Sequence, residues 1–83
     1  MEIFIFDDCK NDRNDLIRIL QSLSQKNNIP MHIKVQKDLS SLFKNLNNCD
    51  LLFLDMVLGS LNGLSIGQNI KKLYPECRIV IIT

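Results

Sequence analysis

The sequence predicts an α/β fold built around a doubly wound parallel sheet. Short apolar segments alternate with segments of helical periodicity along all 83 residues, which is the spacing of βαβ units. Three of the four apolar segments are apolar throughout, as expected for strands covered on both faces, whereas the one at residues 31–35 alternates. Right-handed crossovers then give the strand order 2-1-3-4, with the alternating strand at an edge.

The first half of the chain predicts a strand, a long helix and a second strand. Residues Glu2–Phe6 form a short apolar strand with β-branched and aromatic content. We expect Asn11 to cap the helix that follows. The apolar face of this helix recurs at i, i+3, i+4 and i+7, namely at Leu16, Ile19, Leu20 and Leu23. The helix should end by Pro30, before the alternating strand at residues 31–35.

The second half predicts two more helices and two more strands. Asp38 can cap a helix whose buried face consists of Leu39, Leu42, Phe43 and Leu46. An apolar strand at residues 50–54 ends at Asp55, and a loop is expected over residues 56–62. The third helix follows Gly63 and stops before Pro75. Its inward residues are predicted to be Leu64, Ile66, Ile70, Leu73 and Tyr74.

The fourth strand, Arg78–Ile82, is too apolar for an exposed sheet edge. We therefore expect residues 1–83 to be the N-terminal part of a domain that lacks a fifth strand and its last helices. If the 83 residues exist alone, this edge should drive self-association.

Composition excludes several classes of protein. Ten Lys and Arg against nine Asp and Glu leave a net charge of +1, so nothing favours nucleic acid binding by this segment. The apolar runs are too short for a membrane span, and no secretory signal precedes Asp7. Three cysteines without a CxxC pair fit a reduced, cytoplasmic protein. A disulfide between Cys49 and Cys77, which precede neighbouring strands, remains an alternative to two free thiols.

Three aspartates follow neighbouring strands of the predicted sheet. Asp7 and Asp8 close the first strand and Asp55 closes the third, so the three carboxylates should converge at the carboxyl edge, where this strand order reverses. Like charges this close favour a hard divalent cation, and Mg²⁺ suits carboxylate ligands. An acidic trio around Mg²⁺ suits phosphoryl transfer to an aspartate. The alternative is that these aspartates are solvated loop residues.

The chain resembles the receiver domain of bacterial two-component response regulators, and within that family the LytTR-type, AgrA-like regulators. The resemblance covers the whole chain. It is carried by Ile5-Phe6-Asp7-Asp8, by Phe53-Leu54-Asp55, by Asn62-Gly63 with Gly67 facing the sheet, and by Ile81-Ile82-Thr83. It implies a flavodoxin-like (CheY-like) fold, in line with the predicted strand order.

The resemblance also implies roles for particular residues. Asp55 would accept a phosphoryl group from a sensor histidine kinase, so the chain would be a phosphoacceptor domain rather than an enzyme. Asp8 would bind Mg²⁺ directly, Asp7 through water and Val57 through its backbone carbonyl, and Asp55 would also be a ligand of the metal. Thr83 would supply the switch hydroxyl. DNA would be bound by a C-terminal LytTR domain that these residues do not contain.

Two departures from the family pattern matter. Receivers carry an essential lysine after the fifth strand, beyond the end of this sequence, and Lys71 and Lys72 should lie on the exposed side of the third helix. Residues 58–61 also replace a loop that contains proline in many receivers.

Other functions fit less well. Flavin binding is disfavoured because Asp7 and Asp8 would repel its phosphate, and a haloacid-dehalogenase-type phosphatase because position 57 is Val. A pure interaction or assembly module, formed by a degenerate or truncated receiver, remains the alternative.

Overall fold

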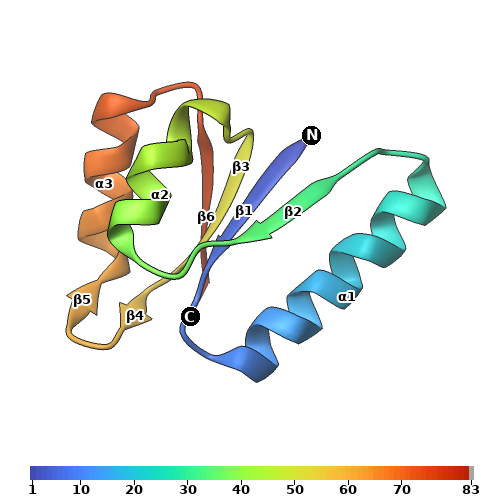
Figure 1. Cartoon of the computed structure of the whole chain (residues 1–83), viewed down its shortest axis with the longest axis horizontal. Helices are drawn as coiled ribbons and strands as arrows, with labels where there is room; N and C mark the ends of the chain where they lie inside the picture. Colours follow the sequence, from blue (N-terminus) through green and yellow to red (C-terminus); the bar gives the residue numbers. More distant parts are fainter. Residues whose placement is uncertain (83) are drawn as a thin grey trace.

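The computed structural model describes residues 1–82 and has the predicted α/β architecture (Figure 1). In chain order its elements are β1 (Glu2–Phe6), α1 (Lys10–Asn27), β2 (His32–Val35), α2 (Leu39–Asn45), the 3₁₀ turn η1 (Leu46–Asn48), β3 (Leu51–Asp55), β4 (Val57–Leu58), β5 (Leu61–Asn62), α3 (Gly63–Leu73) and β6 (Arg78–Ile82).

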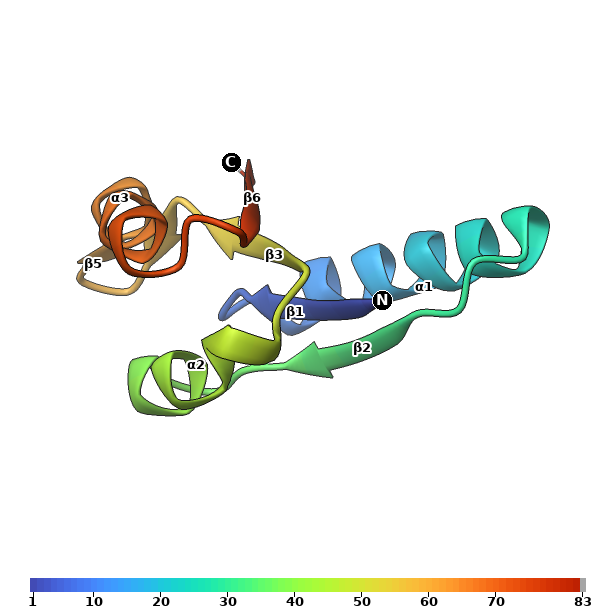
Figure 2. The ribbon, with the colours of Figure 1, turned by 90° about the horizontal axis from the view of Figure 1, so that it is seen from above.

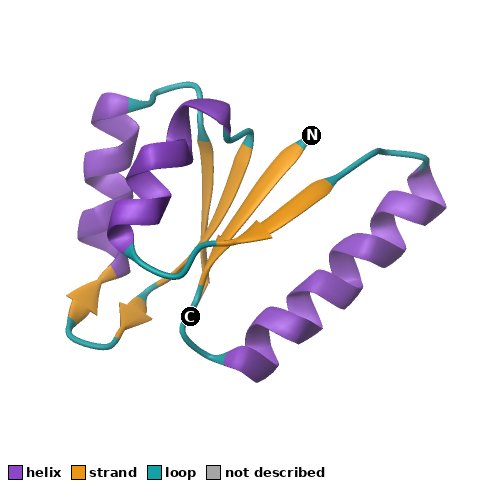
Figure 3. Ribbon diagram, viewed as in Figure 1, coloured by secondary structure: helices purple, strands orange, loops and turns teal. Residues whose placement is uncertain are grey.

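The four long strands form one parallel sheet in the order β2-β1-β3-β6 (Figure 3). This is the predicted order 2-1-3-4, with β6 as the fourth strand, and it is compatible with a CheY-like fold. In the register of the sheet, Phe6 lies opposite Leu54 and Asp55 lies opposite Ile82. The carboxyl ends of β1, β3 and β6 therefore meet at one edge.

Helices cover the sheet from two sides, with α1 on one face and α2 and α3 on the other (Figure 2). Ile3 and Ile5 of β1 pack with Leu20 of α1. Phe4 and Phe6, the alternate residues of β1, belong to the core beneath α2 and α3. Successive residues of a strand point to opposite faces, which explains why residues 3–6 of β1 are all apolar.

The predicted start and apolar face of α1 need correction. The helix begins at Lys10 with Cys9, not Asn11, at the N-cap, and Cys9 makes no side-chain capping bond. Leu16 and Leu20 pack on the sheet as predicted. Ile17, which was not predicted, packs beside them, whereas Ile19 and Leu23 are 57% and 44% exposed. The apolar stripe of α1 is wider than the part of the sheet that the helix contacts.

Prediction and structure agree over α2. The Asp38 side chain accepts a hydrogen bond from the Ser41 backbone N–H at 2.7 Å, as an N-cap should. Leu42 and Leu46 are buried, and Leu39 and Phe43 pack against the same core.

The segment between β3 and α3 was predicted as a loop, but it contains the two-residue strands β4 and β5. They pair antiparallel around a turn in which Gly59 has a φ of +62°, a conformation that glycine adopts at little cost. Within α3, Ile66 and Ile70 are buried and Tyr74 packs on the core as predicted.

Two other residues of α3 contradict the prediction. Leu64 and Leu73 are 49% and 66% exposed, because only the side of the helix that carries Ile66, Gly67 and Ile70 faces the sheet.

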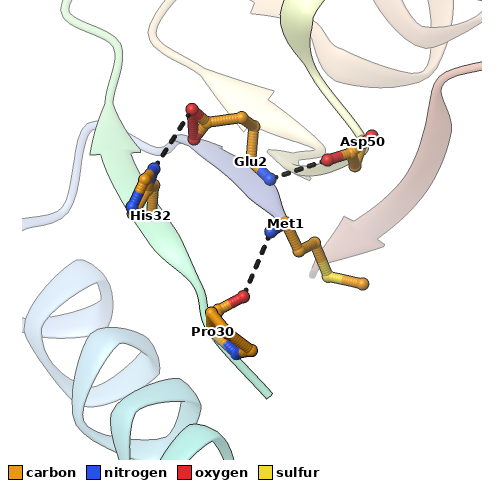
Figure 4. Close-up of polar contacts among 5 residues, drawn as sticks. All are labelled: Met1, Glu2, Pro30, His32 and Asp50. Carbon is orange, nitrogen blue, oxygen red and sulfur yellow. Dashed lines mark hydrogen bonds and ion pairs between the residues drawn. The ribbon is translucent and has the colours of Figure 1, made fainter.

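At the amino edge of the sheet, polar contacts join neighbouring segments of the chain (Figure 4). This edge is opposite to the carboxyl edge, where the aspartate site is predicted. The Asp50 carboxylate accepts from the Glu2 backbone N–H at 2.7 Å, and the N-terminal ammonium donates to the Pro30 carbonyl at 3.1 Å. His32 is exposed, as its place on the polar side of the edge strand predicts. Its ring lies 3.3 Å from the Glu2 carboxylate, a partner that the sequence did not predict.

Cys49 and Cys77 are buried free thiols at the same end of β3 and β6. Burial, with a smaller contribution from the neighbouring Cys77, raises the pKa of Cys49 to about 12. Burial likewise raises the pKa of Cys77. Both thiols therefore stay protonated at neutral pH, which disfavours their oxidation to a disulfide.

β6 forms an edge of the described sheet and is only partly covered. Val80 is 42% exposed, and Ile79, Ile81 and Ile82 are half-buried. Lys71 and Lys72 are exposed on α3, as predicted. Over residues 1–82, no helix combines the length and the apolar character needed to cross a membrane.

Candidate functional site

Asp7, Asp8 and Asp55 form one acidic cluster, as predicted. Each offers a carboxylate oxygen, and these three oxygens all lie within 4.8 Å of one another. The parallel register creates the cluster: Phe6 pairs with Leu54, so the residues that follow them come together at the carboxyl edge of β1 and β3. The three side chains differ in burial, since Asp7 is buried, Asp55 is half-buried and Asp8 is exposed.

Asp7 occupies the least solvated position of the cluster and is only 6% exposed. Burial raises the pKa of its carboxyl group, and the charges of Asp55 and Asp12 raise it further. A hydrogen bond of 2.9 Å, donated by the Cys9 backbone N–H, acts in the opposite direction without cancelling the shift. An ionised Asp7 therefore costs free energy unless a positive charge lies close by.

Main-chain groups hold Asp55 and the segment that follows it. The Val57 backbone N–H donates to the Asp55 carboxylate at 3.2 Å, so the main chain of Val57 adjoins the cluster. The Met56 N–H donates to the Ile82 carbonyl at 2.9 Å, which ties this segment to β6. The role predicted for the Val57 carbonyl as a metal ligand stays a prediction.

Gly63 lets α3 begin directly behind the acidic cluster. Its N–H donates to the Met56 carbonyl at 2.7 Å. A Cβ atom at this position would overlap the Asp55 carbonyl oxygen and crowd the Asp55 carbonyl carbon. The preceding residue, Asn62, caps the helix by accepting from the backbone N–H groups of Leu64 and Ser65. The Asn62-Gly63 pair therefore positions the helix next to Asp55.

The predicted switch residue, Thr83, lies outside the described residues. Its role stays a prediction.

The donor set of the acidic cluster fits a hard divalent cation. Three carboxylates converge, and one of them is buried with a raised pKa. Carboxylate oxygens are ligands that Mg²⁺ prefers, and Mg²⁺ is usually bound through only one or two protein carboxylates. A cation bound through two of the three carboxylates would leave the third for another task.

Three polar residues lie next to the cluster. The Arg13 guanidinium donates to the Asp7 carbonyl at 2.8 Å. Arg13, Gln36 and Lys37 line a pocket together with Asp7 and Asp8. Gln36 directly follows the alternating strand, a position that gives no sign of burial, and only the fold shows that it is buried.

The whole chain is similar to a set of curated bacterial proteins. It is 30% identical over 88 aligned residues to Accessory gene regulator protein A of Staphylococcus aureus strain N315, and the alignment covers 100% of this chain and 37% of that protein. Accessory gene regulator protein A of strain MW2 and Accessory gene regulator A of strain COL match with the same identity and coverage. No family model matches the chain.

These similarities support a distant relation to response regulators, as the AgrA-like motifs predicted. The chain spans 37% of the length of the curated relatives it matches.

Proposed function

We propose that this chain is the receiver module of a LytTR-type transcription regulator in a two-component system, and that it is phosphorylated on Asp55. The observation that supports this proposal is the convergence of Asp7, Asp8 and Asp55 within 4.8 Å. One cluster of this kind supplies both the ligands of a divalent cation and a carboxylate nucleophile. The kinship with Accessory gene regulator protein A supports the same role.

Each aspartate has a separate task in this proposal. Asp8, the exposed member, binds Mg²⁺ directly, and the buried Asp7 holds it through water. The Val57 carbonyl completes the protein ligands. When bound, Mg²⁺ would offset the charge of the carboxylates and of the phosphoryl oxygens. An oxygen of Asp55 forms a bond to phosphorus while the bond between phosphorus and the donor breaks, which yields an aspartyl phosphate.

This role implies which partner the chain has and where in the cell it acts. A sensor histidine kinase supplies the phosphoryl group, and the reaction takes place in the cytoplasm. In this proposal the Thr83 hydroxyl donates a hydrogen bond to the new phosphoryl group. Genes are regulated through a DNA-binding domain in a longer protein.

Intact mass measured after incubation with Mg²⁺ and acetyl phosphate tests this proposal. We expect the chain to gain one phosphoryl group and the Asp55→Asn variant to gain none. Asp50→Asn is the matched control, because Asp50 lies at the opposite end of β3 and its variant should still be phosphorylated. An Asp55→Asn variant that still gains a phosphoryl group would contradict the proposal.

A second candidate function is assembly through β6. The free edge of this strand and the 42% exposure of Val80 favour pairing with a second copy. Light scattering over a range of concentrations should then show a mass above that of a monomer. Val80→Lys should restore the monomer, whereas Ile29→Lys, at a site 41% exposed and remote from β6, should not. A stable monomer at high concentration would exclude this candidate.

A further inference from the structure

The outer side of β6 pairs with no strand within residues 1–82. On its inner side, the Arg78 N–H and the Ile82 carbonyl bond to main-chain groups at the two ends of β3, at 3.3 and 2.9 Å. Because the main-chain groups of successive residues point to opposite sides of a strand, Ile79 and Ile81 direct their N–H and C=O groups away from β3. The edge therefore offers donors and acceptors to a further strand.

The two faces of β6 differ in how they are covered. Ile79 and Ile81 face α3, since a Cβ atom on Gly67 would meet them at 3.9 and 3.5 Å. Val80, between them, points to the other face, is 42% exposed and lies outside the core that α1 covers. Gly67 contacts the residues on either side of Val80, so the middle of α3 lies level with the middle of β6.

An apolar groove of about 480 Å³ runs between α3 and β6, which lie side by side at one end of the sheet (Figure 2). Its lining includes the half-exposed Leu64 and the exposed Gln68 and Lys71. The groove adjoins the free edge of β6. A partner that adds a strand to this edge must therefore also cover the groove with apolar groups on the same face of the sheet.

A second copy of the chain meets both requirements. If two β6 strands pair antiparallel with Val80 opposite Val80, Ile79 of each copy lies opposite Ile81 of the other. Ile79 and Ile81 then exchange N–H···O=C bonds across the join, and each outward main-chain group finds a partner. Such a contact is related by a two-fold axis perpendicular to the sheet, so both α3 helices lie on the same face.

The spacing of the helices fits this arrangement. Gly67 approaches both Leu54 of β3 and Ile81 of β6, so α3 lies above the gap between these strands. With neighbouring strands about 4.8 Å apart, the two α3 helices would lie about 10 Å apart, a distance at which helices pack. They would run antiparallel, with Gln68 near the axis and Leu64 against the aliphatic part of Lys71 of the other copy.

We propose that two copies of this chain join their β6 strands antiparallel about a two-fold axis at Val80, so that the α3 helices pack on each other above one continuous sheet. This inference rests on the second candidate function, assembly through β6, and gives it a register and a helix contact.

Disulfide cross-linking tests the register. Each variant carries Cys9→Ser, because Cys9 is the exposed native thiol. Val80→Cys should join most chains into a covalent dimer under mild oxidation, since a directly opposed pair of this type has Cα atoms about 4.5 Å apart. Arg78→Cys, also exposed and on the same strand, should not cross-link, because the two copies of residue 78 would lie roughly 13 Å apart. Ile29→Cys is the control remote from β6.

Substitutions on α3 test the helix contact. Leu64→Lys should weaken the dimer about tenfold or more in sedimentation equilibrium, because it removes an apolar group from the groove. Leu73→Lys is the matched control: Leu73 is 66% exposed on the same helix but does not line the groove. Its variant should dimerise like the wild type.

Three results would overturn this arrangement. They are a multimer in which Val80→Cys forms no cross-link, an Arg78→Cys variant that cross-links as readily as Val80→Cys, and equal weakening by Leu64→Lys and Leu73→Lys. Each of them leaves assembly through β6 standing in another geometry. A chain that stays monomeric at high concentration overturns both, even if a synthetic peptide of residues 78–82 binds to the edge. The phosphorylation test on Asp55 is independent of these outcomes.

Discussion

At the scale of single residues, the acidic cluster lowers the stability of the folded chain, because its proposed chemistry needs three carboxylates close together. Asp7 is buried beside two other carboxylates, and the resulting rise of its pKa means that the folded state holds this proton more tightly than the unfolded state does. The stabilising contribution of Asp7 is therefore complete below its unfolded pKa and is lost as the pH rises through its folded pKa. Above its folded pKa, the ionised Asp7 carboxylate therefore lowers the stability of the chain unless a cation lies close by.

We therefore expect Asp7→Asn to raise the free energy of unfolding of the cation-free chain at pH 7, by on the order of 1 kcal/mol. The variant should also lose most of the stabilisation that Mg²⁺ gives the wild type, which is about 1.4 kcal/mol at ten times the dissociation constant. Urea unfolding with Mg²⁺ and with a chelator at matched ionic strength measures both effects. Equal stabilisation of both chains by Mg²⁺ would argue against a cation at the cluster.

Gly63 is the second residue that the site requires, for a steric reason. We expect Gly63→Ala to destabilise the chain by roughly 1–3 kcal/mol, because its methyl group would overlap the Asp55 carbonyl. Gly67→Ala is the control in the same helix. Its Cβ would meet Leu54 at 3.4 Å and Ile81 at 3.5 Å, and helix propensity favours Ala over Gly by about 1 kcal/mol. Thermal unfolding should separate the two variants, and equal losses would refute the steric argument.

At the scale of elements, the two helix N-termini that flank the core differ in how they are capped. Asp38 caps α2 with a hydrogen bond to the Ser41 N–H, and this bond lowers the pKa of the Asp38 carboxyl. Its stabilising contribution is thus present above its unfolded pKa and is lost as the pH falls through its folded pKa. Cys9 holds the equivalent position of α1 in extended backbone geometry but makes no capping bond.

Cys9→Ser should therefore stabilise the chain by about 0.5–1 kcal/mol, because a serine hydroxyl at an N-cap accepts from the first free N–H groups of the helix. Ser40→Ala is the comparison on α2, at an exposed position in the same first turn of the helix. Its effect on stability should be small. The midpoint of urea unfolding measures both, and a Cys9→Ser variant less stable than the wild type would contradict the assignment of the cap.

At the scale of the whole molecule, the exposure and reactivity of the three thiols show whether the core is packed. Cys9 is exposed, whereas Cys49 is 8% and Cys77 is 2% exposed, each with a pKa raised by burial. Thiolates react with alkylating agents and protonated thiols scarcely do. We expect one thiol to react with iodoacetamide in the folded chain and three in denaturant, as counted by intact mass. Rapid labelling of all three thiols without denaturant would show that this core does not form.

A second feature at the scale of the whole molecule is the apolar surface that remains exposed to solvent. Ile19 and Leu23 on α1, Leu64 on α3 and Val80 on β6 are each more than two-fifths exposed. The sequence marks such positions as apolar, but it cannot say which of them the described fold covers.

The sequence by itself determined the order of elements, the strand order and the cluster of Asp7, Asp8 and Asp55. These features follow from local periodicity and from the handedness of βαβ units, which act on near neighbours in the chain. Only the tertiary structure decided the rest: that Ile17 rather than Ile19 packs on the sheet, that residues 57–62 form a hairpin, and that Gln36 is buried. Each depends on how one element rotates or closes against another, and a contact between distant segments leaves no periodic signal in either of them.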